Sequence, residues 1–165
     1  MNLTGLISRI EPLDAAAMAA ARARQDTLTK PAGSLGRLEA LSVQMAGITG
    51  SVRPTVTHKV VTVMAGDHGV VAEGVSAFPQ AVTPQMVFNF LQGGAAINVL
   101  ARHVGARVVI ADLGVAAEMG AHPGLIDRKV APGAANIAVG PAMTRAQAER
   151  AILAGAEIVA AEIER

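Results

Sequence analysis

The sequence predicts an α/β protein with a Rossmann-like, three-layer fold, built from a parallel sheet and an N-terminal helical hairpin. Residues 60–64 and 107–114 are two β-branched runs that are apolar at nearly every position, which is typical of strands covered on both faces. A helical segment separates them, so strand, helix and strand predict a right-handed βαβ unit. The last helix reaches Arg165 without a stop signal, and two or three parallel strands make a narrow sheet. We therefore expect an incomplete domain.

We expect the chain to divide into residues 1–55, a helical hairpin with its connector, and residues 56–165, the N-terminal part of an α/β domain whose C-terminal half is absent. Asp14 is placed to cap a helix over residues 15–25, which is rich in alanine. Ser34 is predicted to cap the second helix. One face of this second helix carries the apolar residues Leu35, Leu38, Leu41, Met45 and Ile48.

The start of the second helix has two interpretations. Lys30, Ser34 and Arg37 are able to hold an anionic group at a helix N-terminus, where free backbone N–H groups point outward. The more ordinary interpretation is a tight turn with a capping serine and two solvated cations. The sequence leaves both open.

Polar residues follow the first predicted strand directly. Asp67, His68 and Glu73 lie in the loop after this strand, and open parallel sheets bind ligands beyond the carboxyl ends of their strands. Asp112 takes the equivalent place in the second strand. Two such carboxylates predict the polar floor of a cleft, although capping a loop or pairing with a cation is the alternative for either aspartate.

The helix between the two strands is predicted from its punctuation. Thr83 followed by Pro84 is typical of a helix start, with a capping hydroxyl and a proline at the first helical position. Gly93 and Gly94 interrupt the helix, which resumes over residues 95–104. Phe78, Phe88 and Phe90 are the three aromatic residues of the chain. A flat ligand that stacks on this protein would do so in this window, with an ordinary core role as the alternative.

A Gly- and Pro-rich excursion over residues 115–141 leads to the final helix. A long segment of this kind inside a compact domain is usually functional or forms an interface. Thr144 and Gln147 predict a capping box. The apolar positions of the final helix are Ala148, Ile152, Gly155, Val159 and Ile163.

Composition excludes several classes of function. The chain has 14 Lys and Arg against 13 Asp and Glu, so no basic stripe points to nucleic acid. It has no cysteine, which rules out disulfides and thiolate metal sites, and a metal held by Asp67, His68 and Glu73 is a weak hypothesis. No GxSxG, HExxH, GxGxxG or GxxxxGKS/T motif is present. Lacking an apolar run of about 18 residues, the chain is expected to be soluble and cytoplasmic, not membrane-bound.

Four blocks of sequence carry a resemblance. They are KPAGSLGRLEAL (30–41), VMAGDHGVVAEGVSAFPQAVTPQMV (63–87), FLQGGAAINVLARHVGARVVIADLGV (90–115) and NIAVGPAMTRAQAE (136–149). In this order, and over almost the whole chain, they resemble the N-terminal half of the nicotinate-nucleotide–dimethylbenzimidazole phosphoribosyltransferases. The pattern DHG-xxx-EGVS beside KPxGSLGRLE is far more specific than a generic Rossmann signal.

The resemblance implies a reaction and a site. The family transfers phosphoribosyl from nicotinate mononucleotide to 5,6-dimethylbenzimidazole, giving α-ribazole phosphate and nicotinate for the nucleotide loop of cobalamin. It implies a homodimer without metal or organic cofactor. By this resemblance Phe78, Gln85 and Met86 are candidates for the wall of the benzimidazole slot, with Asp67 and His68 beneath. An apolar slot with few polar groups suits a methylated bicyclic ring.

The resemblance also implies what this chain lacks. The family's catalytic glutamate and its GxGExGxxNTT phosphate loop belong to the C-terminal half, so no catalytic residue is assigned here, and Glu73 is not given that role. We expect the chain alone to bind the base weakly at best and to be inactive. Two alternatives are a non-catalytic base-binding fragment and a dimerisation fragment that uses the alanine-rich first helix and the final helix.

Overall fold

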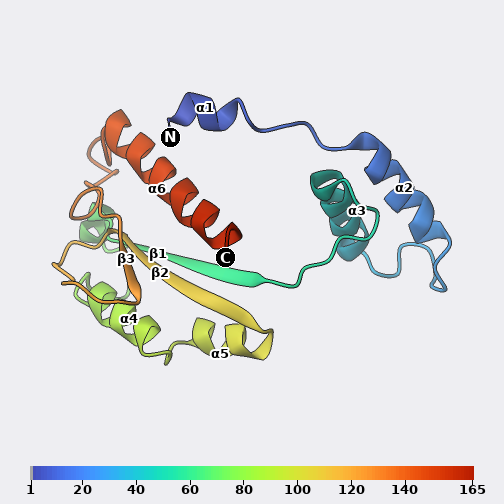
Figure 1. Ribbon diagram of the computed structural model, residues 1–165. Coiled ribbons are helices and arrows are strands. Elements are labelled where there is room, and N and C mark those ends of the chain that lie inside the picture. The colour runs from blue at the N-terminus through green and yellow to red at the C-terminus, as the bar shows by residue number, and fades with distance from the viewer. Residues whose placement is uncertain (1) are drawn as a thin grey trace. The chain divides into compact units, whose positions relative to one another are not determined.

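The computed structural model describes residues 2–165 and divides them into two compact units (Figure 1). One unit is Thr4–Thr57, and the other is His58–Arg165, with residues 2 and 3 grouped with it. A short helix, α1, spans Leu3–Ile7 near the N-terminus. Each unit has its own hydrophobic core.

The first unit is the predicted helical hairpin. Its helices are α2 (Ala15–Asp26) and α3 (Arg37–Thr49), and the Asp14 carboxylate accepts a hydrogen bond from the Ala17 N–H at 2.9 Å, which confirms the predicted cap. Small residues allow the two helices to approach closely. The buried core consists of Ala17, Ala21, Val43 and Ala46, with Met18 packed against it.

The start of α3 was predicted wrongly. The helix begins at Arg37, and its N-cap is Gly36, at φ 53°, a conformation that glycine adopts readily. Ser34 lies in the preceding turn and does not cap. The Glu39 side chain binds the turn instead, because its carboxylate accepts the Leu35 N–H at 3.2 Å. The predicted apolar face is also largely solvent-exposed, at Leu35, Leu38, Leu41 and Ile48, while α2 covers the face of Val43 and Ala46.

The second unit contains a parallel sheet in the order β1-β2-β3, with β1 at Lys59–Gly66, β2 at Ala106–Gly114 and β3 at Leu125–Asp127. Helices α4 (Val82–Leu91) and α5 (Ala96–His103) connect β1 to β2, so the predicted βαβ order is confirmed. The short β3, inside the glycine-rich excursion, was not predicted as a strand.

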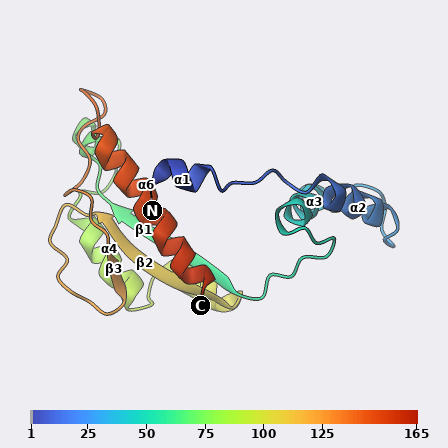
Figure 2. The same cartoon turned by 45° about the horizontal axis from the view of Figure 1, so that its top comes forward.

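Helices cover both faces of the sheet, which gives the three layers that the sequence predicts (Figures 1 and 2). Alternate residues of β2 supply the two cores, as the pleat of a strand requires. Ile110 packs with Val87 of α4 on one face, and Val109 packs with Ile158 of α6 (Arg145–Ile163) on the other.

Two expectations about burial in this unit were wrong. Strand β1 is an edge strand in this sheet, so its residues are mostly half-buried and Met64 is exposed, whereas β2 is central and buried from 109 to 112.

The second expectation concerns helix α6. This helix starts with the predicted capping box, in which Thr144 accepts the Gln147 N–H and Gln147 accepts the Thr144 N–H. It turns Ala154 and Ile158 toward the sheet. The predicted face, with Ile152, Val159 and Ile163, is exposed.

Candidate functional site

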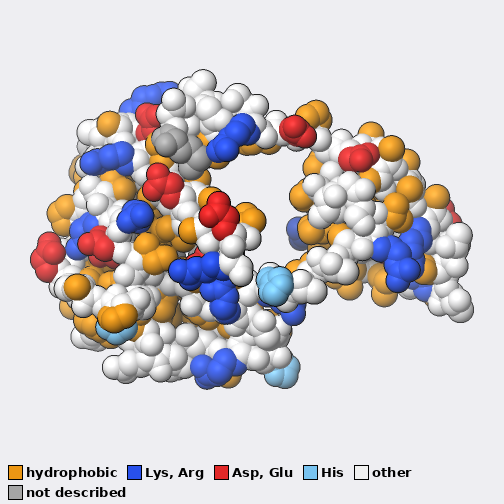
Figure 3. All heavy atoms as spheres, in the orientation of Figure 1, with side chains coloured by type: hydrophobic (Ala, Val, Ile, Leu, Met, Phe, Trp, Pro, Cys, Tyr) orange, Lys and Arg blue, Asp and Glu red, His pale blue; other side chains and the backbone are white. Residues whose placement is uncertain are grey.

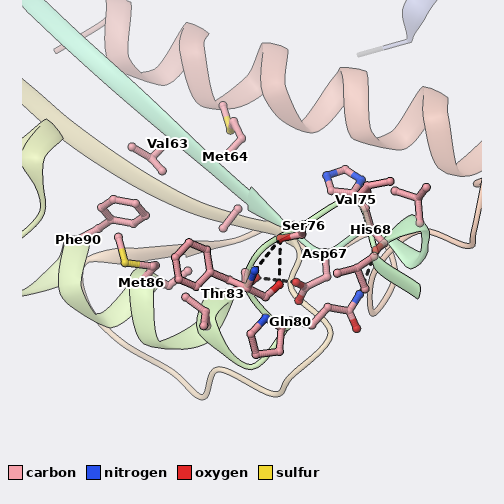
Figure 4. Close-up of a pocket in the computed structure, with 18 residues that line it drawn as sticks. Val63, Met64, Asp67, His68, Val75, Ser76, Gln80, Thr83, Met86 and Phe90 are labelled. Atoms are coloured by element: carbon pink, nitrogen blue, oxygen red, sulfur yellow. Dashed lines mark hydrogen bonds between the residues drawn. The ribbon is translucent and has the colours of Figure 1, made fainter. Parts of the chain in front are cut away.

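A pocket of about 450 Å³ opens at the carboxyl end of β1 (Figure 4). Its walls come from the end of β1, the loop that contains the 3₁₀ helix η1 (Gly69–Glu73), and the inner side of α4. The wall is mostly apolar, and its apolar members include Val63, Met64, Val75, Phe78, Met86 and Phe90. The polar members are Asp67, His68, Ser76, Gln80 and Thr83. This composition suits a flat apolar ligand with a few polar atoms.

Four of the five predicted slot residues line this pocket. Phe78 and Met86 belong to its apolar wall, and Asp67 and His68 lie at the end of β1. Gln85 is exposed on α4 and is not part of the wall, because it precedes Met86 on the helix and points to another side.

Phe78 lies in an exposed loop that a serine holds in shape. The Ser76 hydroxyl donates to the Phe78 carbonyl at 2.9 Å and accepts the Phe78 N–H at 3.2 Å. The Phe78 residue is 68% exposed although it borders the pocket. An aromatic ring in such a place has area free for stacking.

Asp67 is the best-buried polar residue of the pocket, with 5% of its surface exposed. Its carboxylate accepts the Thr83 hydroxyl at Oδ1, at 2.6 Å, and the Ala116 N–H at Oδ2, at 2.8 Å. The predicted role of Thr83 as the N-cap was therefore wrong. Helix α4 starts at Val82, and the Thr83 hydroxyl is directed to the Asp67 carboxylate because a charged acceptor makes the stronger bond.

Asp112 does not share a cleft floor with Asp67. Its Oδ1 accepts the N–H groups of Gly114 and Val115, at 2.9 and 2.8 Å, and its Oδ2 lies 3.4 Å from the Lys129 ammonium. It is 1% exposed and is not part of the pocket wall. The alternative interpretation of this aspartate, as a loop cap paired with a cation, is the one that the structure supports.

The loop after β1 is held against the loop around residue 134. His68 and Ala134 form an isolated parallel bridge, and the Gly69 N–H donates to the Ala134 carbonyl at 2.8 Å. The Gln80 side chain donates to the His68 carbonyl at 3.2 Å. Beside this contact lies a smaller cavity of about 150 Å³, which shares Asp67 and His68 with the main pocket.

Sequence reasoning missed three polar residues of the site, Ser76, Gln80 and Thr83. Ser76 and Gln80 lie two residues on either side of Phe78, and the pattern at Thr83 predicts a helix cap rather than a pocket residue. The signal that was available is their position, because a pocket at a strand end draws its wall from the loop and the helix that follow.

At the possible anion site of the hairpin, one of the two basic side chains is paired with a carboxylate of the same unit. The Lys30 ammonium lies 2.6 Å from the Glu39 carboxylate. That hydrogen bond from Lys30, together with the Leu35 N–H, lowers the pKa of Glu39 below its ordinary value of 4.5. Since Ser34 does not begin the helix either, the structure retains the tight turn of the ordinary interpretation, but without its capping serine and with Lys30 paired to Glu39 rather than solvated.

Within residues 2–165 no cluster of three or more His, Asp or Glu side chains is arranged to hold a metal ion. Among the same residues, none of the helices has the length and apolar character to cross a membrane.

An α/β sheet with an apolar pocket at the carboxyl end of a strand is the arrangement in which open α/β proteins commonly bind small molecules. A family profile described as "Phosphoribosyltransferase" matches residues 10–165, and the chain belongs to this family.

Three similar proteins all carry the name of one enzyme within this family. A nicotinate-nucleotide–dimethylbenzimidazole phosphoribosyltransferase of Roseiflexus sp. is 65% identical over 93% of this chain, and one of Geobacter sulfurreducens is 60% identical over 94%. A crystal structure of the Thermus thermophilus enzyme of that name matches 92% of this chain with a TM-score of 0.84 and 53% identity. The resemblance drawn from the four sequence blocks is thereby confirmed.

The chain spans less than half the length of these relatives. It covers 43% and 44% of the two curated proteins and 46% of the solved chain. The match therefore concerns the N-terminal half of the relatives.

Proposed function

We propose that this chain forms the benzimidazole slot of a nicotinate-nucleotide–dimethylbenzimidazole phosphoribosyltransferase. The reaction transfers phosphoribosyl from nicotinate mononucleotide to 5,6-dimethylbenzimidazole, and gives α-ribazole phosphate and nicotinate. The observation that carries the proposal is the apolar pocket at the end of β1, walled by Phe78 and Met86, in a chain whose relatives have that name. Gln85, next to this wall, stays a candidate for a contact at its rim.

The chemistry asks for a planar base held in line with the anomeric carbon of the ribose. A ring nitrogen attacks this carbon as nicotinate leaves, and the N–H proton of the benzimidazole passes to a base. The carboxylates near the pocket are engaged elsewhere, since Asp67 accepts from Thr83 and Ala116, and Glu73 accepts the Asn136 amide at 2.6 Å. We therefore propose that the residues described here bind and orient the base, without a catalytic group among them.

The proposal has consequences for the isolated chain. We expect the 165-residue chain to bind 5,6-dimethylbenzimidazole weakly and not to catalyse transfer. The reason is that, by the resemblance, the family's catalytic glutamate and phosphate loop belong to the C-terminal half. A homodimer, a cytoplasmic location and the lack of a metal or organic cofactor remain predictions from the resemblance. Exposed apolar side chains favour the second candidate, a dimerisation fragment. They lie on α3 at Leu38, Leu41 and Ile48 and on α6 at Ile152, Val159 and Ile163.

Thermal unfolding with and without 5,6-dimethylbenzimidazole tests the slot. A ligand that binds only the folded state raises its stability by about 2.7 kcal/mol at a hundred times Kd. We expect a saturable rise in the unfolding midpoint that is lost in Phe78→Ala and in Met86→Ala. Phe88→Ala is the matched control, because Phe88 is 44% exposed on α4 and is not part of the pocket wall.

If the chain unfolds cooperatively and 5,6-dimethylbenzimidazole does not change its unfolding midpoint, the proposed slot is wrong. If the midpoint instead depends on protein concentration and not on the base, the dimerisation fragment is the better proposal. Formation of α-ribazole phosphate by the purified chain from both substrates would show that the expectation of inactivity is wrong.

A further inference from the structure

Asp67 joins four separate segments of the chain at one point. Its backbone N–H donates to the Gly114 carbonyl and its backbone carbonyl accepts the Ala134 N–H, each at 2.9 Å. Its carboxylate takes the Thr83 hydroxyl at 2.6 Å and the Ala116 N–H at 2.8 Å. The end of β1 is thus tied to three other segments, which are the end of β2 with the residues just after it, the loop around residue 134, and α4.

Of these four contacts, the one with Thr83 is a side-chain link between Asp67 and the helix that walls the pocket. Figure 4 shows Thr83 beside Asp67, with Met86 farther along α4. Thr83 and Met86 are three residues apart, and this spacing places them on one side of the helix. A change in the distance between Thr83 and Asp67 therefore moves the Met86 side chain relative to β1.

At its other end, α4 is tied to α5 by the Asn98 side chain, which donates to the Phe90 carbonyl at 3.1 Å. Toward the sheet, the rest of α4 is held by apolar packing, which does not specify its position as sharply. Val87, Phe90 and Leu91 pack on Ala65 and Ile110. Apolar contacts of this kind are non-directional, whereas a hydrogen bond to a buried carboxylate fixes distance and angle. The bond lies in the first turn of the helix, and both of its residues line the pocket.

We infer that Thr83 is a positioning residue of the slot, which acts through Asp67 to set the width between Met86 on α4 and the end of β1. This inference rests on the proposed function for the identity of the ligand, a flat bicyclic azole. The geometric part, that Thr83 fixes the position of Met86, stands on the hydrogen bonds alone.

The first test follows the methionine methyl groups of the 165-residue chain by NMR, without ligand. Thr83→Val keeps the shape of the side chain and removes the hydroxyl, while Thr83→Ser keeps the hydroxyl. We expect the resonances of Met64 and Met86, both in the pocket wall, to shift in Thr83→Val and to stay near the parent positions in Thr83→Ser. Met18, in the core of the helical hairpin, is the internal reference.

Thr49→Val is the matched control variant. It also removes a helix threonine hydroxyl that is hydrogen-bonded, here to the Met45 carbonyl at 2.8 Å, but in the other unit. We expect it to leave the Met64 and Met86 resonances in place. If Thr83→Val also leaves them in place, Thr83 does not position the helix and the inference is wrong.

The second test measures Kd for 5,6-dimethylbenzimidazole by titration, well below the unfolding midpoint of every variant. We expect Thr83→Val to weaken binding about tenfold, the loss of one hydrogen bond to a charged group, and Thr83→Ser to restore it. A lower midpoint with an unchanged Kd would assign Thr83 a structural role only and overturn the inference. If the parent chain does not bind the base, the proposed slot fails, while the methyl resonances still decide the positioning role.

Discussion

At the scale of single residues, two aspartates that the sequence places equivalently have different positions and roles. Asp112 lies within β2, opposite Ala65, whereas Asp67 follows the end of β1. Asp67 and Asp112 both follow apolar strand residues, and the sequence gives no reason to separate them. Asp112 binds N–H groups two and three residues away and a lysine, so it stabilises its own loop. Asp67 binds Thr83 and Ala116, which are distant in sequence, so it connects elements. The difference lies in which neighbours the fold brings to each carboxylate.

Glu39 supplies a prediction at the same scale. The Lys30 ammonium bonded to it, with the Leu35 N–H, holds its pKa below 4.5 in the folded chain. A group whose pKa is lower in the folded state binds fewer protons there, so it stabilises the fold above its unfolded pKa. We expect its contribution to be complete at neutral pH and to disappear as pH falls below 4.5 through the folded pKa.

Chemical unfolding between about pH 7 and about pH 2, with the parent and Glu39→Gln compared, measures this. The parent should be more stable at neutral pH, and the difference should shrink in acid. A difference that does not change with pH would show that the charge on Glu39 is immaterial. Glu164→Gln, at the exposed end of α6, provides the control for removal of one carboxylate.

At the scale of elements, local rules placed helices well and their first residues less well. Asp14 and Thr144 cap as predicted, since each side chain accepts the N–H of the residue three positions on, Ala17 and Gln147. Thr83 and Ser34 do not cap, because Asp67 takes the first hydroxyl and Glu39 occupies the turn beside the second. A capping motif predicts that a helix starts nearby, and tertiary partners decide which residue starts it.

Two glycines give opposite predictions for the loop of the site and for α6. A Cβ on Gly69 would lie 2.6 Å from the Asn136 nitrogen and 2.9 Å from the Ala134 oxygen, both backbone atoms that cannot move aside. Gly155, inside α6, has no such neighbour within 4 Å. We expect Gly69→Ala to destabilise the chain by about 1 to 3 kcal/mol. Gly155→Ala should stabilise it by about 0.5 to 1 kcal/mol.

Urea unfolding of the two variants beside the parent gives both free energies, and each variant is the other's control for the added methyl group. A neutral Gly69→Ala would mean that the bridge between His68 and Ala134 tolerates separation. A destabilising Gly155→Ala would mean that the helix packs more closely at this position than the structure shows.

At the scale of the whole molecule, the chain carries separate cores and exposed apolar faces. The core of the helical hairpin uses alanines, whereas the α/β unit places valine and isoleucine on both faces of β2. In Figure 3, hydrophobic side chains are visible on the surface of both units. Leu38 on α3 and Ile163 on α6 are 63% and 79% exposed. The chain covers less than half of its relatives' length, so these exposed faces are described here for that part of the family's length only.

The separate cores predict separate responses to a core substitution. Val87 is 1% exposed, and Val87→Ala should cost the α/β unit roughly 1 to 3 kcal/mol by the cavity it leaves. During thermal unfolding, the methyl resonances of Met64 and Met119 should report an earlier transition. The Met18 resonance should keep the parent midpoint. A parallel shift of all three would show that the two units unfold as one.

The sequence by itself determined the order of the longer helices and of the strands β1 and β2, which form the βαβ unit, together with two helix caps and the family. Each of these depends on neighbouring residues or on motifs that are contiguous in the chain, such as DHG-xxx-EGVS. Four of five predicted slot residues, among them Phe78 and Met86, line one pocket because they belong to the loop and the helix that come after β1. Gln85 does not, since the side of a helix that faces a pocket depends on where the helix begins.

Only the tertiary structure decided which faces are buried and which carboxylate connects the site. Helix α6 turns Ile158, not Val159, to the sheet, and the Thr83 hydroxyl binds Asp67 sixteen residues away rather than its own helix. Ile158 and Val159 are both apolar, and the Thr83 hydroxyl is able to bond either to its own helix or to Asp67, so residue type does not decide between the alternatives. Packing and hydrogen bonds between segments that are distant in sequence decide between these alternatives. A local sequence pattern cannot predict them, because it does not include the residues that become neighbours only in the fold.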